Sequence, residues 1–280
     1  MQIFEKIPAL NQTLNRLRSD NVKIGFVPTM GAIHNGHISL INKALEENEL
    51  VVCSIYVNPK QFNNQEDLKN YPRTLKEDVE LIQLTNCNIL FVPSTEEIYP
   101  PEEIQSDYDF GHLDKIMEGL HRPGHFQGVG AVIQRLFEII KPHRAYFGAK
   151  DYQQVAIIRR LTENLNLSVE IVSCPTQREP DGLAMSSRNK NLTEEARKIA
   201  PHIYRILNLS KEKANSFSIE ELKQWVEKEI NNTHFLKLDY FELSDAETLT
   251  PLKNWNSPGN NIACIAVFAG KIRLIDNIIL

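Results

Sequence analysis

The chain has 280 residues and a net charge of −5, with 42% hydrophobic and 24% charged residues. We expect a soluble globular protein, long enough for one large core or for two domains, and without a nucleic-acid partner, which would require a basic surface. The longest apolar stretch, residues 50–57, is much shorter than the roughly 20 residues of a membrane-spanning helix, so we also expect no membrane partner.

From residue 22 onward, short β-branched runs alternate with helical patterns. The predicted strands are residues 22–28, 50–58, 88–93, 143–148 and 168–175, and the predicted helices are residues 36–48, 74–86, 127–141 and 152–166. Strands that are apolar throughout and separated by helices are typical of a parallel sheet covered on both faces.

The pattern changes after Pro175. Residues 193–230 favour helices, residues 234–245 alternate like a strand, and residues 262–280 predict a hairpin that turns at Gly270. The fold class predicted is therefore α/β, with a parallel-sheet domain over residues 1–178 and a smaller α+β domain over residues 179–280.

The four cysteines indicate buried thiols. Cys53, Cys87, Cys174 and Cys264 are far apart and form no CxxC pair, so disulfide and metal roles are disfavoured. The first residues lack the basic-then-apolar order of a signal peptide. We therefore expect a reducing, cytoplasmic location.

Polar loops follow four of the predicted strands. They are residues 28–37, 57–62, 147–154 and 174–190. Ligands of an open parallel sheet lie beyond the carboxyl ends of its strands. We expect these loops to form one composite site.

The first loop contains an HxGH motif, with His34 and His37 at a predicted helix start and Gly36 between them. A helix amino terminus offers unpaired N–H groups and a partial positive charge, to which imidazoles add donors, so a polyphosphate is the expected ligand. The alternative is a capping histidine and a core histidine. The position directly after a strand favours the phosphate interpretation.

Two further loops carry candidate cations. Lys150 and Asp151 precede a helix, where they suit phosphate binding, or simple solvation and helix capping. Ser186, Ser187 and Arg188 lie in a glycine-containing segment that suits closure over phosphates, or a linker with a capping serine.

Uncharged amides lie where a small polar substrate would bind. Asn58, Gln61 and Gln154 can orient such a substrate without titrating, although turn and cap roles are equally consistent with each one. Residues 121–128 supply another cationic patch, with glycine hinges and a rigid proline, and are interpreted as a second flap or wall.

Several common catalytic motifs are absent from the sequence. There is no GxxxxGK[ST] phosphate loop, no GxGxxG dinucleotide motif, no GxSxG nucleophile motif and no HExxH zinc motif. Kinases with a phosphate loop, dehydrogenases and hydrolases are disfavoured. Nucleotidyl or adenylyl transfer remains, because positioning and charge stabilisation do most of that work.

The HxGH and MSSR motifs resemble those of the nucleotidylyltransferase superfamily. In finer detail, VPTMGAIHNGH, YVNPKQF, YPRTLKEDVELI, RPGHFQGV, FGAKDYQQ and REPDGLAMSSRN resemble, in order over residues 22–195, the pantoate–beta-alanine ligase family. The resemblance implies a Rossmann-like domain, a second domain that closes over the active site, a homodimer and a Mg²⁺-dependent reaction. ATP and (R)-pantoate would form pantoyl adenylate and diphosphate, and beta-alanine would then displace AMP to give pantothenate.

The resemblance also implies roles for individual residues. His37 would be the proton donor, and His34, Lys150 and Arg188 would neutralise phosphate charge. Pantoate would bind Gln61 and Gln154, and beta-alanine would bind Gln61 near Asn58; no metal ligands are assigned. The implied ATP contacts are Met30, Gly31, Ala32, Ile33, His34, Asn35, Gly36, His37, Gly148, Ala149, Lys150, Asp151, Gln177, Met185, Ser186, Ser187 and Arg188.

Two positions depart from the family pattern. Ala149 replaces a common glutamate, and Gln177 replaces a common apolar residue. Contacts through the backbone would survive both changes.

Two alternatives stay open. One is another HxGH enzyme, such as a cytidylyltransferase or a truncated aminoacyl-tRNA synthetase. A synthetase should carry a tRNA-binding extension, but only about a hundred residues follow the predicted sheet and the chain is acidic. The other is a nucleotide-binding regulator that has lost the chemistry, although His34, His37, Lys150 and Arg188 are all present.

Overall fold

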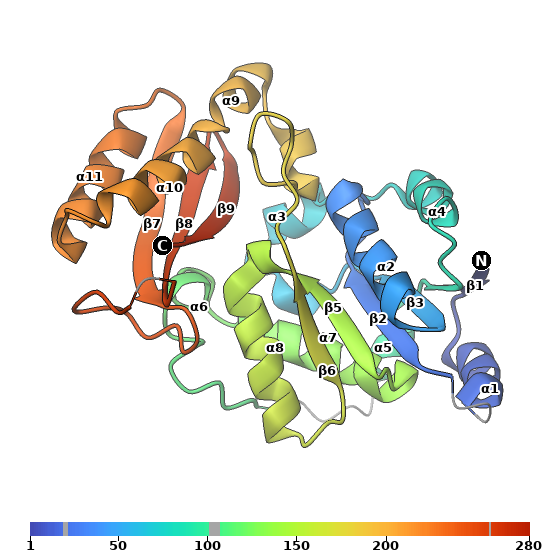
Figure 1. Ribbon diagram of the computed structural model, residues 1–280. Helices are drawn as coiled ribbons and strands as arrows, with labels where there is room; N and C mark the ends of the chain where they lie inside the picture. Colours follow the sequence, from blue (N-terminus) through green and yellow to red (C-terminus); the bar gives the residue numbers. More distant parts are fainter. Residues whose placement is uncertain (19–21, 101–106, 258) are drawn as a thin grey trace. The chain divides into compact units, whose positions relative to one another are not determined.

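The computed structural model describes residues 1–18, 22–100, 107–257 and 259–280. The contacts among these residues divide the chain into two compact units. Figure 1 shows the helices and strands of both units. The first unit comprises Met1–Ala149 and Gln154–Pro175, and the second comprises Lys150–Gln153 and Thr176–Leu280. The predicted domain division after residue 178 stays a prediction.

The first unit contains a six-stranded parallel sheet in the order β1-β4-β3-β2-β5-β6. This confirms the parallel sheet predicted from the apolar runs. Strand β1 was not predicted. The strands are β1 (Gln2–Phe4), β2 (Ile24–Thr29), β3 (Leu50–Ile55), β4 (Ile89–Phe91), β5 (Arg144–Gly148) and β6 (Glu170–Cys174).

Helices cover both faces of this sheet. Because neighbouring strand residues point to opposite faces, Phe26 packs in a core with helices α1, α7 and α8, whereas Val27 packs in a core with α2 and α4. The helices are α1 (Ile7–Arg18), α2 (Asn35–Glu47), α3 (Gln65–Asn70), α4 (Leu75–Gln83), α5 (Thr95–Ile98), α6 (Met117–His121), α7 (His125–Ile140) and α8 (Tyr152–Asn164), with 3₁₀ turns η1 (Pro59–Gln61) and η2 (Ala149–Asp151).

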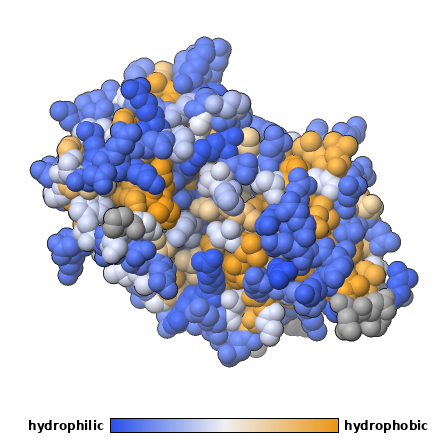
Figure 2. Space-filling view, in the orientation of Figure 1, coloured by the Kyte–Doolittle hydropathy of each residue, from blue (hydrophilic) through white to orange (hydrophobic). Residues whose placement is uncertain are grey.

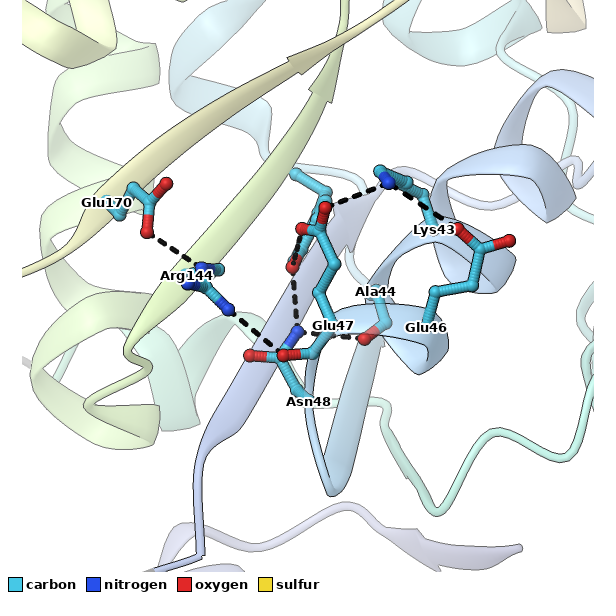
Figure 3. Close-up of polar contacts among 8 residues, drawn as sticks. Lys43, Ala44, Glu46, Glu47, Asn48, Arg144 and Glu170 are labelled. Carbon is cyan, nitrogen blue, oxygen red and sulfur yellow. Dashed lines mark hydrogen bonds and ion pairs between the residues drawn. The ribbon is translucent and has the colours of Figure 1, made fainter.

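Polar side chains tie the carboxyl end of α2 to β5, as Figure 3 shows. Glu47 forms an ion pair with Lys43 at 2.9 Å and accepts a hydrogen bond from the Tyr146 hydroxyl at 2.8 Å. Arg144 donates to the Glu47 carbonyl at 3.0 Å and to Glu170 at 2.7 Å. The hydrogen bonds from Lys43 and Tyr146 lower the pKa of Glu47. These contacts fix the helix whose opposite end carries the two histidines of the motif.

The second unit packs helices against an antiparallel sheet of order β7-β8-β9. Its elements are η3 (Ser187–Asn191), α9 (Glu194–Ile199), α10 (His202–Lys213), α11 (Ile219–Asn231), β7 (Leu236–Asp245), β8 (Asn261–Ala269) and β9 (Ile272–Ile279). Gly270, with φ +61°, lies in the turn between β8 and β9, as predicted. The α+β architecture expected for this part of the chain is confirmed.

All four cysteines are buried and free, which confirms their interpretation as buried thiols. Burial raises the pKa of Cys87 to about 11 and that of Cys53 well above its usual value. At neutral pH these two side chains are therefore thiols rather than thiolates.

Hydrophilic residues cover most of the face shown in Figure 2, and hydrophobic residues are visible in patches between them. Leu75, Leu81 and Leu84 on and after α4 are among the exposed apolar side chains. Across the described residues, none of the helices combines the length and the apolar character needed to cross a membrane.

Candidate active site

The predicted site loops of the first unit follow neighbouring strands. In the sheet, β3, β2, β5 and β6 lie side by side and parallel, so their carboxyl ends share one edge. His34 and His37 follow β2, Asn58 and Gln61 follow β3, and Gly148 ends β5. These strand ends therefore lie along one edge of the sheet, and the composite site expected there stays a prediction.

A buried carboxylate holds the turn between β2 and α2. Asp78 on α4 is 1% exposed and accepts hydrogen bonds from the backbone N–H groups of Ala32, at 2.9 Å, and Ile33, at 2.7 Å. The Thr74 hydroxyl donates to the same carboxylate at 3.1 Å. Gly31 has φ +79°, and a Cβ at this position would lie 3.0 Å from Asp78, so glycine fits both the turn and the close approach. The backbone just before the histidines is therefore fixed.

His34 and His37 form a capping box at the amino end of α2. Nδ1 of His34 accepts a hydrogen bond from the Gly36 amide at 3.1 Å, and Nδ1 of His37 accepts one from the His34 amide at 3.4 Å. The ring centroids lie 4.0 Å apart. Because Nδ1 accepts in both rings, each neutral imidazole carries its proton on Nε2. Capping therefore sets the tautomer that has a donor at Nε2, and the two interpretations of the motif are compatible.

The side chain of Asn58 is fully hydrogen-bonded within the protein. Its Oδ1 accepts from the Lys60 amide at 3.2 Å and from the Tyr99 hydroxyl at 3.0 Å. Its Nδ2 donates to Gln61 Oε1 at 3.1 Å and to the Gly128 carbonyl at 3.0 Å. With all four bonds made inside the fold and 1% exposure, Asn58 orients the Gln61 amide.

Gln61 joins the η1 turn to the first loop. Its Nε2 lies 2.9 Å from the Met30 sulfur, and its side chain is 8% exposed. The structure thus brings together three residues of the predicted site, Met30, Asn58 and Gln61. Gln154 lies half-buried in the first turn of α8, and no hydrogen bond joins it to Gln61 in the described part of the chain.

Helix α7 packs directly on the η1 turn. Buried His125 has its Nδ1 2.8 Å from the Gln61 carbonyl and its Nε2 3.2 Å from Arg122. Because arginine only donates, Nε2 accepts and the Nδ1–H group donates to Gln61. The backbone of the Gln61 turn is therefore held as well as its side chain.

The interpretation of residues 121–128 as a glycine-hinged flap is wrong in part. Gly124, with φ +80°, is a turn at the amino end of α7, but Gly128 is buried inside that helix. A Cβ on Gly128 would lie 2.2 Å from the Lys60 carbonyl oxygen. Glycine is required at residue 128 for close packing rather than for movement.

Lys150 and Asp151 lie in η2, directly after β5, with Gly148 and Ala149 preceding them. Lys150 Nζ is 3.9 Å from Asp151 Oδ1, and the lysine side chain is 16% exposed. By their contacts, both residues belong to the second unit, although the chain places them between β5 and α8.

In the second unit, Gln177 and residues 185–188 are brought together. The Met185 amide donates to the Gln177 carbonyl at 2.9 Å, so the two ends of a short hairpin meet. The Ser186 hydroxyl then caps η3 by accepting from the Arg188 amide at 3.3 Å. Ser187 is buried, and Arg188 is half-buried. The contact of Gln177 with its neighbours is through the backbone.

Sequence reasoning did not single out Asp78 or His125. Asp78 lies on the same face of α4 as buried Ile82, and a carboxylate on the apolar face of an amphipathic helix was the signal available. His125 ends the RPGH segment, residues 122–125, and this segment does not indicate which group the imidazole of His125 contacts.

A parallel α/β sheet whose strand ends lead into an HxGH helix start and into cationic loops defines the class of nucleotide-binding α/β proteins. Within this class, the chain belongs to the pantoate–beta-alanine ligase family, because the family model named Pantoate-beta-alanine ligase matches residues 2–279. The resemblance inferred from the motifs is thereby confirmed.

Relatives in this family match the chain over its length. A pantothenate synthetase of Azobacteroides pseudotrichonymphae is 48% identical over 279 residues, 99% of each chain. The crystal structure of a pantothenate synthetase from Thermus thermophilus has a TM-score of 0.92 and 41% identity, covering 99% of each chain. A Francisella tularensis pantoate-beta-alanine ligase complexed with beta-gamma ATP and beta-alanine has a TM-score of 0.84 and 40% identity, covering 100% of this chain and 97% of that one.

Proposed function

We propose that this protein condenses (R)-pantoate with beta-alanine at the expense of ATP, giving pantothenate, AMP and diphosphate. The observation that carries the proposal is the match of residues 2–279 to the pantoate–beta-alanine ligase family. His34, His37, Lys150 and Arg188 are all present in the chain, which argues against a regulator that has lost the chemistry. The Francisella tularensis complex supports ATP and beta-alanine as substrates.

In the first step, the pantoate carboxylate attacks the α-phosphorus of ATP, and diphosphate leaves. We assign pantoate to the amides of Gln61 and Gln154, because uncharged amides can fix a hydroxy acid without changing its charge. Asn58, which holds the Gln61 amide at 3.1 Å, positions that contact and borders the beta-alanine site.

Negative charge builds on the phosphates during this step. We assign the proton-donor role to His37, whose Nε2–H follows from the hydrogen bond at Nδ1, with His34 beside it at a centroid distance of 4.0 Å. To Lys150 and Arg188 we assign the positive charge that neutralises the phosphates. The remaining ATP contacts are proposed for the residues that carry the family motifs: residues 30–37, 148–151, 177 and 185–188.

In the second step, the amine of beta-alanine attacks the acyl carbon of pantoyl adenylate. A C–N bond forms, the C–O bond to phosphate breaks, AMP leaves and the nitrogen loses a proton. The mixed anhydride is already activated, so the step requires no protein nucleophile. What the protein must supply is orientation and exclusion of water.

Mg²⁺ is proposed as part of the nucleotide substrate. In the part of the chain that the structure describes, no three His, Cys, Asp or Glu side chains gather as a metal site. Mg²⁺ commonly binds phosphates, waters and only one or two carboxylates, so the absence of a dedicated cage among these residues fits Mg–ATP.

We extend the proposal to a cytoplasmic homodimer, as family resemblance implies. The four free, buried cysteines fit a reducing compartment, where thiols stay reduced. Equilibrium sedimentation of the purified protein measures the oligomeric state directly.

The decisive experiment is exchange of labelled diphosphate into ATP by the purified protein with Mg²⁺ and no beta-alanine. We expect exchange with (R)-pantoate and not with lactate or other hydroxy acids, because the adenylate forms before the amine reacts. Added beta-alanine should then release AMP in equal amount to pantothenate. Exchange that does not depend on pantoate, or that prefers CTP, would contradict the assignment.

A further inference from the structure

The segment that carries Lys150 is attached to the second unit by two hydrogen bonds. Asn277 on β9 donates from Nδ2 to the Lys150 carbonyl at 2.9 Å. The Tyr152 hydroxyl donates to the Ala246 carbonyl, directly after β7, at 2.7 Å. The backbone of Lys150 is therefore held by the antiparallel sheet of the second unit.

The hairpin that leads to Arg188 is attached to the same strand. Asp276, which is 5% exposed, accepts two hydrogen bonds from Arg178, at 2.6 and 3.0 Å. The Arg178 guanidinium also lies 3.6 Å from the centre of the Tyr204 ring and donates to the Gly182 carbonyl at 3.2 Å. A bidentate, stacked arginine is held in one orientation, which lysine would not reproduce.

Backbone contacts carry this anchoring from Arg178 to the serines and Arg188. Arg178 pairs with Ala184 in an antiparallel bridge, and the next pair, Gln177 with Met185, is joined at 2.9 Å. Asn189 donates to the Ala184 carbonyl at 3.1 Å, so both sides of residues 186–188 are attached to the hairpin.

The two attachments are coupled at adjacent residues. The Asn277 backbone amide donates to Asp276 Oδ1 at 2.9 Å, the same oxygen that accepts from Arg178. One continuous set of hydrogen bonds thus runs from Lys150 through Asn277 and Asp276 to Arg178.

We propose that Asp276 and Asn277 on β9 are positioning residues for ATP, setting the backbone of the Lys150 segment and of the Arg188 hairpin as one piece. The inference rests on the proposed function, in which Lys150 and Arg188 meet the phosphates. Neither β9 residue is assigned a contact with substrate. They act on ATP through the two cationic segments, because a charge displaced by about 1 Å loses part of its attraction for the bound phosphates.

The test uses the full chain with Asn277→Ala and Asn277→Asp, and exposed Asn254→Ala in the same unit as the matched control. Both Asn277 changes remove the donor to the Lys150 carbonyl. We expect the Kd for Mg–ATP without pantoate, from calorimetry, and the KM for ATP in diphosphate exchange each to rise about tenfold, while the KM for pantoate changes by less than about twofold. Asn277→Gln, which keeps an amide donor, should recover part of the ATP affinity.

The Arg178 attachment is tested by Arg178→Lys, which keeps the charge and removes the two-pronged contact. We again expect the Kd and the KM for ATP to rise more than the KM for pantoate. Thermal unfolding of each variant is measured in parallel, because the change leaves the buried carboxylate of Asp276 with a weaker partner.

Two results overturn the inference. One is an ATP Kd of Asn277→Ala equal to that of the control, and the other is an equal rise of both KM values that follows a loss of thermal stability. A wild-type protein that binds ATP but shows no pantoate-dependent exchange would refute the proposed function instead, and the effect of Asn277→Ala on the ATP Kd would still test the role of β9.

Discussion

The two units hold their candidate residues by different means. In the first unit, the candidate groups are imidazoles and amides, and individual atoms of their side chains are fixed: Nδ1 of His37 by the His34 amide, and Oε1 of Gln61 by Asn58. In the second unit, the candidates are the cations Lys150 and Arg188, and the structure fixes the backbone that carries them.

This difference follows from what each group must do. A hydrogen bond from a neutral donor depends steeply on its distance and angle, so the donor atom has to be placed to within a few tenths of an ångström. A long cationic side chain acts mainly as a charge, so a fixed backbone origin is enough to bring it to phosphate. We therefore expect changes in the first unit to reduce turnover most, and changes around the β9 attachments of the second unit to weaken ATP binding most.

The largest effect is expected for His37→Ala. Turnover should fall by about 10²-fold or more, the scale of removing one preorganised donor from developing charge, with a smaller change in ATP affinity. Single-turnover formation of pantoyl adenylate measures this, with far-ultraviolet circular dichroism as the control for folding. Turnover near that of the wild type would reduce His37 to a helix cap and remove the contrast between the units.

A smaller effect is expected for Asp78→Asn. The backbone amides of Ala32 and Ile33 each donate to one oxygen of the Asp78 carboxylate. Asparagine has an NH₂ group in place of one of these oxygens, so one hydrogen bond is lost and the NH₂ group faces a backbone N–H group. We expect turnover to fall about tenfold through misplacement of the loop, and the free energy of unfolding to fall by about 2 kcal/mol. Urea unfolding followed by circular dichroism measures the second quantity.

Exposed Glu77 on the same helix provides the control for Asp78, since Glu77→Gln removes a charge at the neighbouring position without touching the loop. Equal stability and turnover in the two variants would show that the loop between β2 and α2 keeps its conformation without Asp78.

Most strands and helices from residue 22 onward could be predicted because their signals are local, but the short helices α3, α5 and α6 were not predicted. The run predicted as a strand at residues 143–148 is β5, Arg144–Gly148, and the pattern predicted as helical at residues 36–48 is α2, Asn35–Glu47. Strand β1, Gln2–Phe4, was missed because three residues with Ile3 47% exposed show neither alternation nor a continuous apolar run.

The candidate site could be located but not assembled from the sequence. The spacing of His34 and His37 indicated a helix start, and the predicted parallel sheet placed the polar loops at the carboxyl ends of its strands. The groups that hold the loops could not be predicted, because Asp78 contacts a backbone 46 residues away and Asp276 contacts Arg178 across 98 residues. Such contacts leave no periodic trace in a single sequence.

The smallest effect is expected for His202, at the start of α10 in the second unit. Burial, and to a smaller extent Arg205, lowers the pKa of His202, and Glu229 on α11 acts in the opposite direction. Between this lowered pKa and about 6.5, the value of an unperturbed histidine, the unfolded chain binds more protons than the folded one. The free energy of unfolding should therefore fall as the pH falls through that interval.

His202→Gln should flatten this pH dependence below about pH 6.5 and leave the curves of the two proteins parallel near pH 8. Both tryptophans of the chain, Trp225 and Trp255, lie in the second unit, so urea unfolding followed by tryptophan fluorescence reports on that unit alone. Circular dichroism on the same samples follows both units together. An unchanged slope in the variant would assign the acid sensitivity of the second unit to groups other than His202. A pH dependence that flattens in the circular dichroism but not in the tryptophan fluorescence would place the effect of His202 outside the second unit. It would then no longer distinguish the pH response of the second unit from that of the first.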